Sequence, residues 1–561
     1  MKRVLVAVMA MLCIVPAVQA QVDRATLSGT VKDTAGGVLT GATVTVTNIA
    51  TNVVDKTTTS SSGAYLVVNL RSGQYLVEAE APGLQKAVQS VILEIGQRGR
   101  VDITLNVAGL TESVTVEGAR RLLNTEDATL GTVIDNNSVA NLPLAIRNWD
   151  DLLALVPGVQ GDRYTEQGGG TSFGRTGGVN VHGARSLQNN FLLDGVDNNS
   201  ISENVQELTS QVSRPSVDAI QEFKIVTSPY SAEYGRSPGA AISVSTKSGT
   251  NQLHGTLYDF YRNESMDTVD FFSKRAGQKV PTNDQNQFGG NLGGPLIKDK
   301  AFFFVDYEGT RITRGVTRLT VVPTADQRAG IIPGVRDPLT GQPFPGGVIP
   351  ASRMDPYAVN IMALVPLPNQ PGANNFFRQA DLIDNSDRIL GRIDYKMSSK
   401  DSVFARYIYS NRDRQIPGAF GGVIDGTGTS GFGDQKIKTN AMVLGWTHIL
   451  SPSMVNEFRF SWSKADSDAV HQAYGIAPPA NATIPGSITD PVVAGGFPGI
   501  SIDGYFGGPG LGRLGSPDFL PKFQHTNQME FVESLSWLKG NHAFKIGADI
   551  ITPMHNEYYD V

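Results

Sequence analysis

The stretch 387–397, DRILGRIDYKM, decides the fold, because its side chains alternate between two characters. From Ile389 to Met397, apolar or small residues occupy the odd-numbered positions, whereas charged residues such as Arg392 and Asp394 lie between them. The stretch 454–463, MVNEFRFSWS, repeats the pattern with aromatic residues on one side. Because successive side chains of a β-strand point to opposite faces, both stretches predict strands with one apolar and one polar face.

Seven further runs of this kind fill the second half of the chain, and the connections between runs are alternately short and long. This alternation of short and long connections is typical of an outer-membrane β-barrel, whose tilted strands need about 9–11 residues each. A soluble β-sandwich or propeller would also alternate, but soluble domains seldom need loops of this length. We therefore predict a membrane barrel over 249–561, with strands at 253–262, 286–295, 301–310, 387–397, 402–411, 439–449, 454–463, 526–537 and 542–551.

The first twenty residues, MKRVLVAVMAMLCIVPAVQA, have the features of a secretory signal peptide with cleavage after Ala20. Its apolar run is shorter than the roughly 20 residues of a membrane-spanning helix. Cys13 is the single cysteine, so we expect no disulfide, cysteine-bound zinc or cysteine nucleophile in the mature chain. Without Lys2 and Arg3, 45 basic residues face 53 acidic ones, and the net charge of -8 disfavours nucleic acid as a partner.

Residues 22–107 contain short runs rich in Val and Thr, separated by turn residues. Ala42, Val44 and Val46 alternate with threonines, which predicts strands of an antiparallel β-sandwich. The motifs GTVKDTAGGVLTGATVTV and SGAYLVVNLRSGQYLVEAEAPG, in that order, resemble the carboxypeptidase regulatory-like domain. In that family the module accompanies peptidases without performing their chemistry and also precedes outer-membrane receptors, so the resemblance implies no peptidase activity.

The linker 108–120 includes GLTESVTVEGAR, in which residues of high strand propensity lie between two glycines. The segment resembles a TonB box, an extended stretch that adds a strand to the sheet of a periplasmic energy-transducing partner. The alternative is that it forms the last strand of the sandwich or an interdomain strand. On the first interpretation, the candidate contacts are Thr111, Ser113, Val114, Thr115 and Val116.

The stretch RNWDDLLALVPGV, residues 147–159, predicts the best helix of the chain. Asn148 is the expected N-cap, the following aspartates suit the first turn, and Pro157 ends the helix. Its apolar residues follow helical spacing from Trp149 to Val156. We therefore expect a helix that packs one face against a core.

Two segments after this helix resemble the plug domain of TonB-dependent receptors: VNVHGARSLQNNFLLDGVDNNS and SVDAIQEFKIVTSPYSAEYGRSPGAAISVSTKSGTN. They are the most specific resemblance in the sequence. The chain departs from the family at His182, where Arg is preferred, and at Thr227-Ser228-Pro229, where the family has Gly-Pro. The resemblance implies a plug over 121–248, with the motif residues Arg185, Asp194, Gly195, Gly235 and Thr246.

Nine strands would leave the predicted barrel unfinished, because an odd number leaves two unpaired edges at membrane depth. Plugged transporters have about 22 strands, and the last residues, HNEYYDV, do not resemble a terminal aromatic strand. We therefore expect an N-terminal fragment or a truncated product. The predicted fold class is mainly β: a small β-sandwich, an α+β plug and a partial antiparallel transmembrane β-barrel.

The sequence predicts no catalytic, cofactor-binding or metal site. The seven histidines are scattered without HExxH spacing, and neither a GxSxG motif nor a phosphate-binding loop is present. Asp194, Asp197, Asn198 and Asn199 offer oxygens for calcium, but their spacing does not match an EF-hand loop, and turns use the same residue types.

Two functions remain open. The first is energised uptake of a large solute, such as an oligosaccharide or a peptide, across the outer membrane of a Gram-negative bacterium. The plug would then be rearranged by a TonB-type partner at 111–116, and outer-membrane lipid would surround the barrel. The alternative is a surface adhesion or display protein, in which long loops such as 464–525 bind partners without transport.

Overall fold

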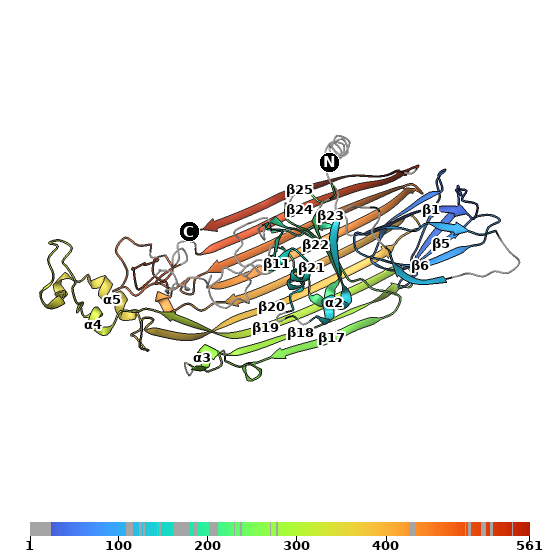
Figure 1. The fold of residues 1–561 in the computed structure, drawn as a ribbon. Coiled ribbons are helices and arrows are strands. Elements are labelled where there is room, and N and C mark those ends of the chain that lie inside the picture. Colours follow the sequence, from blue (N-terminus) through green and yellow to red (C-terminus); the bar gives the residue numbers. More distant parts are fainter. Residues whose placement is uncertain are drawn as a thin grey trace, which may run out of the picture.

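The computed structural model is an elongated molecule with a small sandwich at one end, long strands in the middle and large loops at the other end (Figure 1). The predicted signal peptide lies outside the described residues. The structure describes residues 24–560 without 108–115, 123–125, 127–128, 143, 145–146, 162–178, 185–187, 201–210, 229–230, 236–237, 270, 276–278, 426–432, 489, 492–494, 507–511, 517–519 and 541.

The N-terminal part is a sandwich of two sheets. Its strands are β1 (Ala25–Asp33), β2 (Thr43–Asn48), β3 (Val54–Thr58), β4 (Ala64–Leu70), β5 (Gly73–Glu80), β6 (Ala87–Leu93), β7 (Arg98–Arg100), β8 (Ile103–Leu105) and β9 (Val116–Arg121). One sheet has the order β3-β2-β5-β6-β9, and in the other β1 pairs with β4, β7 and β8. Ala42, Val44 and Val46 are at most 1% exposed, which confirms the predicted alternation.

The plug is built on a five-stranded sheet with the order β10-β15-β16-β13-β14. Trp149 is fully buried in its core and contacts Phe223 and Phe191, with ring centroids 5.0 and 6.4 Å apart. The elements are β10 (Leu130–Asp135), α2 (Asn136–Asn141), η1 (Trp149–Leu155), β11 (Val159–Gly161), β12 (Val179–Val181), β13 (Asn190–Leu193), β14 (Val196–Asp197), η3 (Val217–Ala219), β15 (Ile220–Ser228) and β16 (Ala241–Thr246).

The predicted helix after Asn148 forms, but η1 is a 3-10 helix rather than an α-helix. Its apolar face is buried as predicted, from Trp149 to Val156. Asn148 occupies the N-cap position as predicted, but it makes no side-chain capping hydrogen bond, because its side-chain oxygen accepts a hydrogen bond from Arg214 instead. Asp150 lies in the first turn, where the helix dipole favours an acidic residue, as predicted. It also forms a buried ion pair with Arg214.

The second half of the chain is a single nine-stranded meander from β17 to β25, in which every strand pairs with its neighbour in sequence. The nine predicted strands are present, but most extend beyond the predicted length, and residues 555–560 continue the last strand instead of leaving it. The bounds are β17 (His254–Arg262), β18 (Asn283–Ile297), β19 (Ala301–Thr320), β20 (Phe376–Lys396), β21 (Asp401–Gln415), β22 (Asp434–Ser451), β23 (Met454–Val470), β24 (Lys522–Lys539) and β25 (His542–Asp560).

The two faces of this sheet have opposite character. Arg392 and Asp394 are 2% and 8% exposed on the face that covers the plug, whereas Ile389 and Ile393 are about half exposed on the other. The plug core includes three apolar residues of the sheet, among them Phe304. An apolar face left outside and a polar face turned inward is the arrangement of a membrane barrel.

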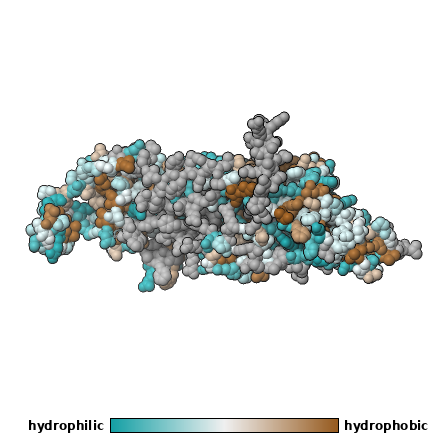
Figure 2. All heavy atoms as spheres, turned by 90° about the horizontal axis from the view of Figure 1, so that it is seen from above, coloured by the Kyte–Doolittle hydropathy of each residue, from teal (hydrophilic) through white to brown (hydrophobic). Residues whose placement is uncertain are grey.

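The long connections lie at one end of the sheet and contain the short helices α3 (Phe271–Arg275), α4 (Ala325–Arg328) and α5 (Pro356–Leu364). Three of these connections share a hydrophobic cluster that includes Ile361, Ile424, Phe497 and Phe506. In the view of Figure 2 hydrophilic and hydrophobic patches are mixed over this end. None of the helices among the described residues combines the length and apolar character that crossing a membrane requires.

Candidate functional site

A tight hairpin in the plug positions the first group of the site. Asp194 and Gly195 connect β13 to β14, and both have positive φ angles, 53° and 77°. This is the backbone of a two-residue turn that favours Asp or Asn followed by Gly. The turn lies against the nine-stranded sheet, so the Asp194 carboxylate is fully buried.

The Asp194 carboxylate holds plug and sheet together. Within the plug it accepts hydrogen bonds from the backbone N–H of Thr246 at 3.0 Å and from its hydroxyl at 2.9 Å. From the sheet, Arg392 Nη1 approaches it at 2.8 Å and Arg406 Nε at 3.0 Å. We call Asp194, Thr246, Arg392 and Arg406 the plug latch.

The ionised form of Asp194 is favoured in this position. Burial alone would raise the pKa of the carboxyl, but the charges of Arg392 and Arg406 and the Thr246 N–H outweigh it and lower the pKa to about 2. Removal of the arginines would leave this buried charge uncompensated and would strongly destabilise the folded protein.

A chain of ion pairs continues from the plug latch to the sandwich. Arg392 also donates to Asp394 with 3.0 Å between Nε and Oδ2, and Asp394 pairs in turn with Arg71, which follows β4. Arg24, at the start of the sandwich, and Arg392 lie over the Phe404 ring at 5.3 and 4.9 Å from its centroid. The sandwich therefore reaches the groups that hold the plug.

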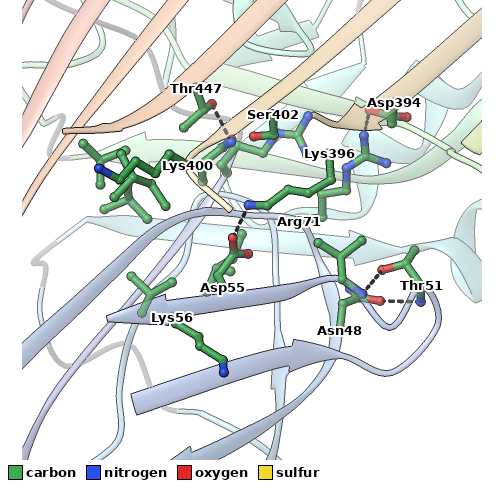
Figure 3. Close-up of a pocket in the computed structure, with 18 of the residues that line it drawn as sticks. Asn48, Thr51, Asp55, Lys56, Arg71, Asp394, Lys396, Lys400, Ser402 and Thr447 are labelled. Carbon is green, nitrogen blue, oxygen red and sulfur yellow. Dashed lines mark hydrogen bonds and ion pairs between the residues drawn. The ribbon is translucent and has the colours of Figure 1, made fainter. Parts of the chain in front are cut away.

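Further contacts fix the sandwich to the turns at its end of the sheet, around a small pocket (Figure 3). The ammonium of Lys396 lies 2.5 Å from the Asp55 carboxylate. The Asn69 amide donates to the Thr447 hydroxyl at 2.6 Å. Asn69 lies in β4 and has a positive φ of 61°, a conformation that Asn adopts more readily than most residues.

The sandwich also contacts the plug directly, through the turn between β6 and β7. The Ile95 N–H donates to the Glu222 carboxylate, and Lys224 Nζ donates to the Gly96 carbonyl at 3.3 Å. Burial raises the pKa of Glu222 to about 7, although the Ile95 N–H and the Ser72 side chain act in the opposite direction.

One carboxylate joins all three parts of the molecule. Glu233 of the plug pairs with Arg98 of the sandwich and with Lys545 of β25, the latter at 3.0 Å. Sandwich, plug and sheet are therefore held together by hydrogen bonds and ion pairs, which can be broken and formed again.

A second group of polar contacts lies between plug and sheet, away from the sandwich. The Ser216 hydroxyl donates to Asp306 of β19 at 2.6 Å. The Asp197 N–H donates to Glu530 of β24 at 2.9 Å. The plug is thus attached to strands at both sides of the sheet.

The structure brings three of the five predicted plug-motif residues together: Asp194, Gly195 and Thr246. Gly235 lies apart from them, and its carbonyl accepts a hydrogen bond from the Asn190 amide at 3.4 Å. Arg185 lies outside the described residues. Among the residues that the structure covers, no group of three or more His, Cys, Asp or Glu side chains could hold a metal ion.

Four of the five candidate TonB contacts, Thr111, Ser113, Val114 and Thr115, also lie outside the described residues. The fifth, Val116, is the first residue of β9, which pairs in parallel with β6. The end of the linker is therefore a strand of the sandwich sheet, as the alternative interpretation of this segment has it. The role of the preceding residues stays a prediction.

The partners of Asp194 on the sheet are not among the residues predicted from the sequence. Arg392 was recognised as part of a polar face, but its contact spans almost two hundred positions in the chain, and spacing along one strand carries no such information. The available signal was the presence of charged residues on the polar face of two adjacent predicted strands.

Comparisons with known proteins agree with this architecture. The model of the outer membrane beta barrel domain matches residues 245–561, that of the TonB-dependent receptor plug domain residues 124–242, and that of the carboxypeptidase regulatory-like domain residues 26–106. The TonB-dependent transporter Oar of Myxococcus xanthus is 27% identical over 339 residues, which cover 58% of this chain and 30% of Oar.

Two solved structures are similar at low identity. The outer membrane transporter YddB from Escherichia coli has 17% identity and a TM-score of 0.47, and the siderophore receptor PirA from Acinetobacter baumannii 14% and 0.44. Each match covers 75% of this chain and 48% of the other. The chain thus spans less than half the length of these relatives. By the barrel model, which matches more than half of its residues, and by the plug and sandwich before it, the chain belongs to the TonB-dependent-receptor-like proteins of the Gram-negative outer membrane.

Proposed function

We propose that the protein takes part in energised uptake of a large solute, such as an oligosaccharide or a peptide, rather than in catalysis. The observation that carries this proposal is the plug latch, in which a buried carboxylate of the plug is held by two arginines of the barrel wall. Contacts of this kind keep a plug in place without a covalent bond. They are lost together when one partner is pulled away.

The energy would come from a periplasmic TonB-type partner that binds residues 111–116. This segment lies between sandwich and plug in the chain, so a pull on it acts on both. An extended segment can add itself to a partner's sheet through backbone hydrogen bonds. Short barrel turns face the periplasm in this class, and the sandwich contacts strands beside these turns, which supports action of a periplasmic partner on it.

Release would involve the sandwich as well as the plug. Because Arg71 and Arg392 share Asp394, undocking of the sandwich removes one of the groups that position Arg392 against Asp194. We infer that the sandwich holds the plug latch in its closed arrangement until the partner acts. This assigns the sandwich a part in the transport cycle.

Binding of a TonB C-terminal domain to the detergent-solubilised protein tests the proposal. Replacement of Val114 by Pro removes a backbone N–H, so it should abolish binding. Val114→Ala keeps the N–H, so its affinity for the TonB C-terminal domain should lie within a few-fold of that of the wild type. Equal binding by the proline variant would contradict the role of this segment.

A second candidate function, surface adhesion or display, rests on the loops. Their shared hydrophobic cluster makes the outer end a folded unit rather than a set of separate connections. Such a unit could present a binding surface without transport. Failure of the wild-type protein to bind any TonB C-terminal domain would favour this function over uptake.

A further inference from the structure

Basic side chains outnumber acidic ones in the pocket between the sandwich and the sheet, which Figure 3 shows in close-up. The pocket has a volume of about 140 Å³. Among the described residues that line it are two acidic ones, Asp55 and Asp394. Six basic residues line it as well: Arg24, Lys56, Arg71, Lys300, Lys396 and Lys400. Since Lys396 and Asp55 neutralise each other in an ion pair, five basic side chains and one acidic side chain are left in the lining.

Three guanidinium groups meet at the buried side of this pocket. Arg24 is 6% exposed, and both Arg24 and Arg392 lie over the Phe404 ring. Arg71 and Arg392 share the Asp394 carboxylate. Burial lowers the pKa of Arg71 well below its ordinary value, and the positive charges of Arg392 and Arg24 lower it further. The three groups therefore repel one another in a place where water screens their charges little.

A bound anion with two negative charges would balance this group. Together with the plug latch it contains four guanidinium groups, but only the two carboxylates of Asp194 and Asp394. Uncompensated buried charge is costly, and a cleft of one sign attracts counter-ions. A phosphate group carries about 1.5 to 2 negative charges at neutral pH, and its oxygens fit the fork of a guanidinium. Since one water molecule needs about 10–15 Å³ of such a space, the pocket has room for a phosphate.

We propose that this pocket binds a phosphate group, with Arg24 and Arg71 as its main donors and Lys400 as a further cation. The ligand is then held from two sides, because both arginines belong to the sandwich and Lys400 to the turn between β20 and β21. A ligand held by both parts binds the docked arrangement more tightly than the undocked one and therefore stabilises docking. The site couples phosphate to the position of the sandwich, whichever function the barrel has.

Isothermal titration calorimetry of the whole chain in detergent with inorganic phosphate, at constant ionic strength and pH, tests this site. Arg24→Gln should weaken binding about tenfold, because a charge-assisted hydrogen bond is lost. Lys400→Gln changes an exposed residue that the fold does not need, and it should weaken binding about threefold. Lys436→Gln, at an exposed position at the other end of β22, is the matched control and should bind phosphate as the wild type does.

Equal affinities of the wild type, Arg24→Gln and Lys400→Gln would overturn the proposal, as would an equal loss in Lys436→Gln or no binding at millimolar phosphate. Circular dichroism of each variant separates loss of binding from loss of the fold. Competition by dioleoyl phosphatidylglycerol in the micelles would identify a lipid headgroup as the source of the phosphate. Binding that this lipid leaves unchanged would identify a soluble phosphate compound.

Hydrogen exchange at the Ile95 N–H tests whether bound phosphate holds the sandwich in place, because this group donates to the plug in the docked state. At a phosphate concentration ten times the Kd and at constant pH, exchange through undocking should be about tenfold slower than without phosphate. The same concentration should have little effect in Arg24→Gln. Exchange that phosphate leaves unchanged in the wild type would contradict a ligand that bridges sandwich and sheet.

Discussion

At the scale of single residues, Asp194 is the plug carboxylate that pairs with arginines of β20 and β21. It is fully buried and has two arginines and one threonine as partners. Its positive φ restricts substitutions, since few residues other than Gly, Asn and Asp adopt this conformation readily. The Asn variant therefore changes the charge with little change in backbone preference.

Asp194→Asn should destabilise the docked plug by about 3–5 kcal/mol, because two buried guanidinium groups lose their carboxylate. Urea denaturation monitored by tryptophan fluorescence reports the loss, since Trp149 lies in the plug core. Asp102→Asn in the sandwich is the control, because its half-exposed pair with Arg100 is worth about 0–1 kcal/mol. Equal effects of the two variants would contradict a special role for Asp194.

The contribution of Asp194 should also depend on pH. Since its pKa in the folded protein is lowered to about 2 from its ordinary value of 3.8, the stabilisation is complete above about pH 4 and is lost as the pH falls toward 2. Asp194→Asn should remove this acid-sensitive part of the unfolding curve between pH 4 and 2. An unchanged difference between wild type and variant across that window would count against the ionised latch.

At the scale of elements, the docking of the sandwich is the feature that distinguishes this molecule from a plug and a barrel alone. Two of its connections reach the groups around the plug latch or a plug strand: the ion pairs through Asp394, and the hydrogen bond from Ile95 to Glu222. The first couples the sandwich to the plug latch, and the second couples it directly to a strand of the plug.

Coupling through Asp394 is measurable by a double-mutant cycle. Arg71→Ala and Asp194→Asn should each destabilise the plug, and their effects should deviate from additivity by more than about 0.5 kcal/mol, as residues within one network do. Replacing Arg71 by Ala together with Asp102→Asn provides the uncoupled pair. Strict additivity in both cycles would mean that the sandwich does not act on the latch.

Docking of the sandwich through Glu222 should have a pH dependence of the opposite sign. Burial raises its pKa from 4.5 to about 7, with Glu94 and Asp135 adding to the shift, so the docked state binds a proton that the undocked state releases. Docking should weaken as the pH rises from about 4.5 through 7. Hydrogen exchange around Ile95, corrected for its intrinsic rate, should show less protection at pH 8 than at pH 5. In Glu222→Gln this difference should vanish, whereas the exposed Glu80→Gln should keep it.

At the scale of the whole molecule, the sequence predicts the order of the parts and the nine strands, because alternation is a local property that a single strand reveals. It does not predict where the plug meets the wall, since Asp194 and Arg392 belong to separate parts of the chain. The 3-10 geometry of η1 and the Arg214 contact of Asn148 depend likewise on tertiary neighbours.

Lipid contact at the outer face of the nine strands is the central prediction, and spin labels along β20 test it most directly. Because Cys13 lies in the predicted signal peptide, single cysteines can be placed at positions 389 to 396 of the protein in outer-membrane vesicles. We expect oxygen accessibility to be high at 389, 391, 393 and 395 and low at 392 and 394, which face the plug. Uniform accessibility to a water-soluble nickel reagent at all these positions would contradict a membrane-embedded sheet.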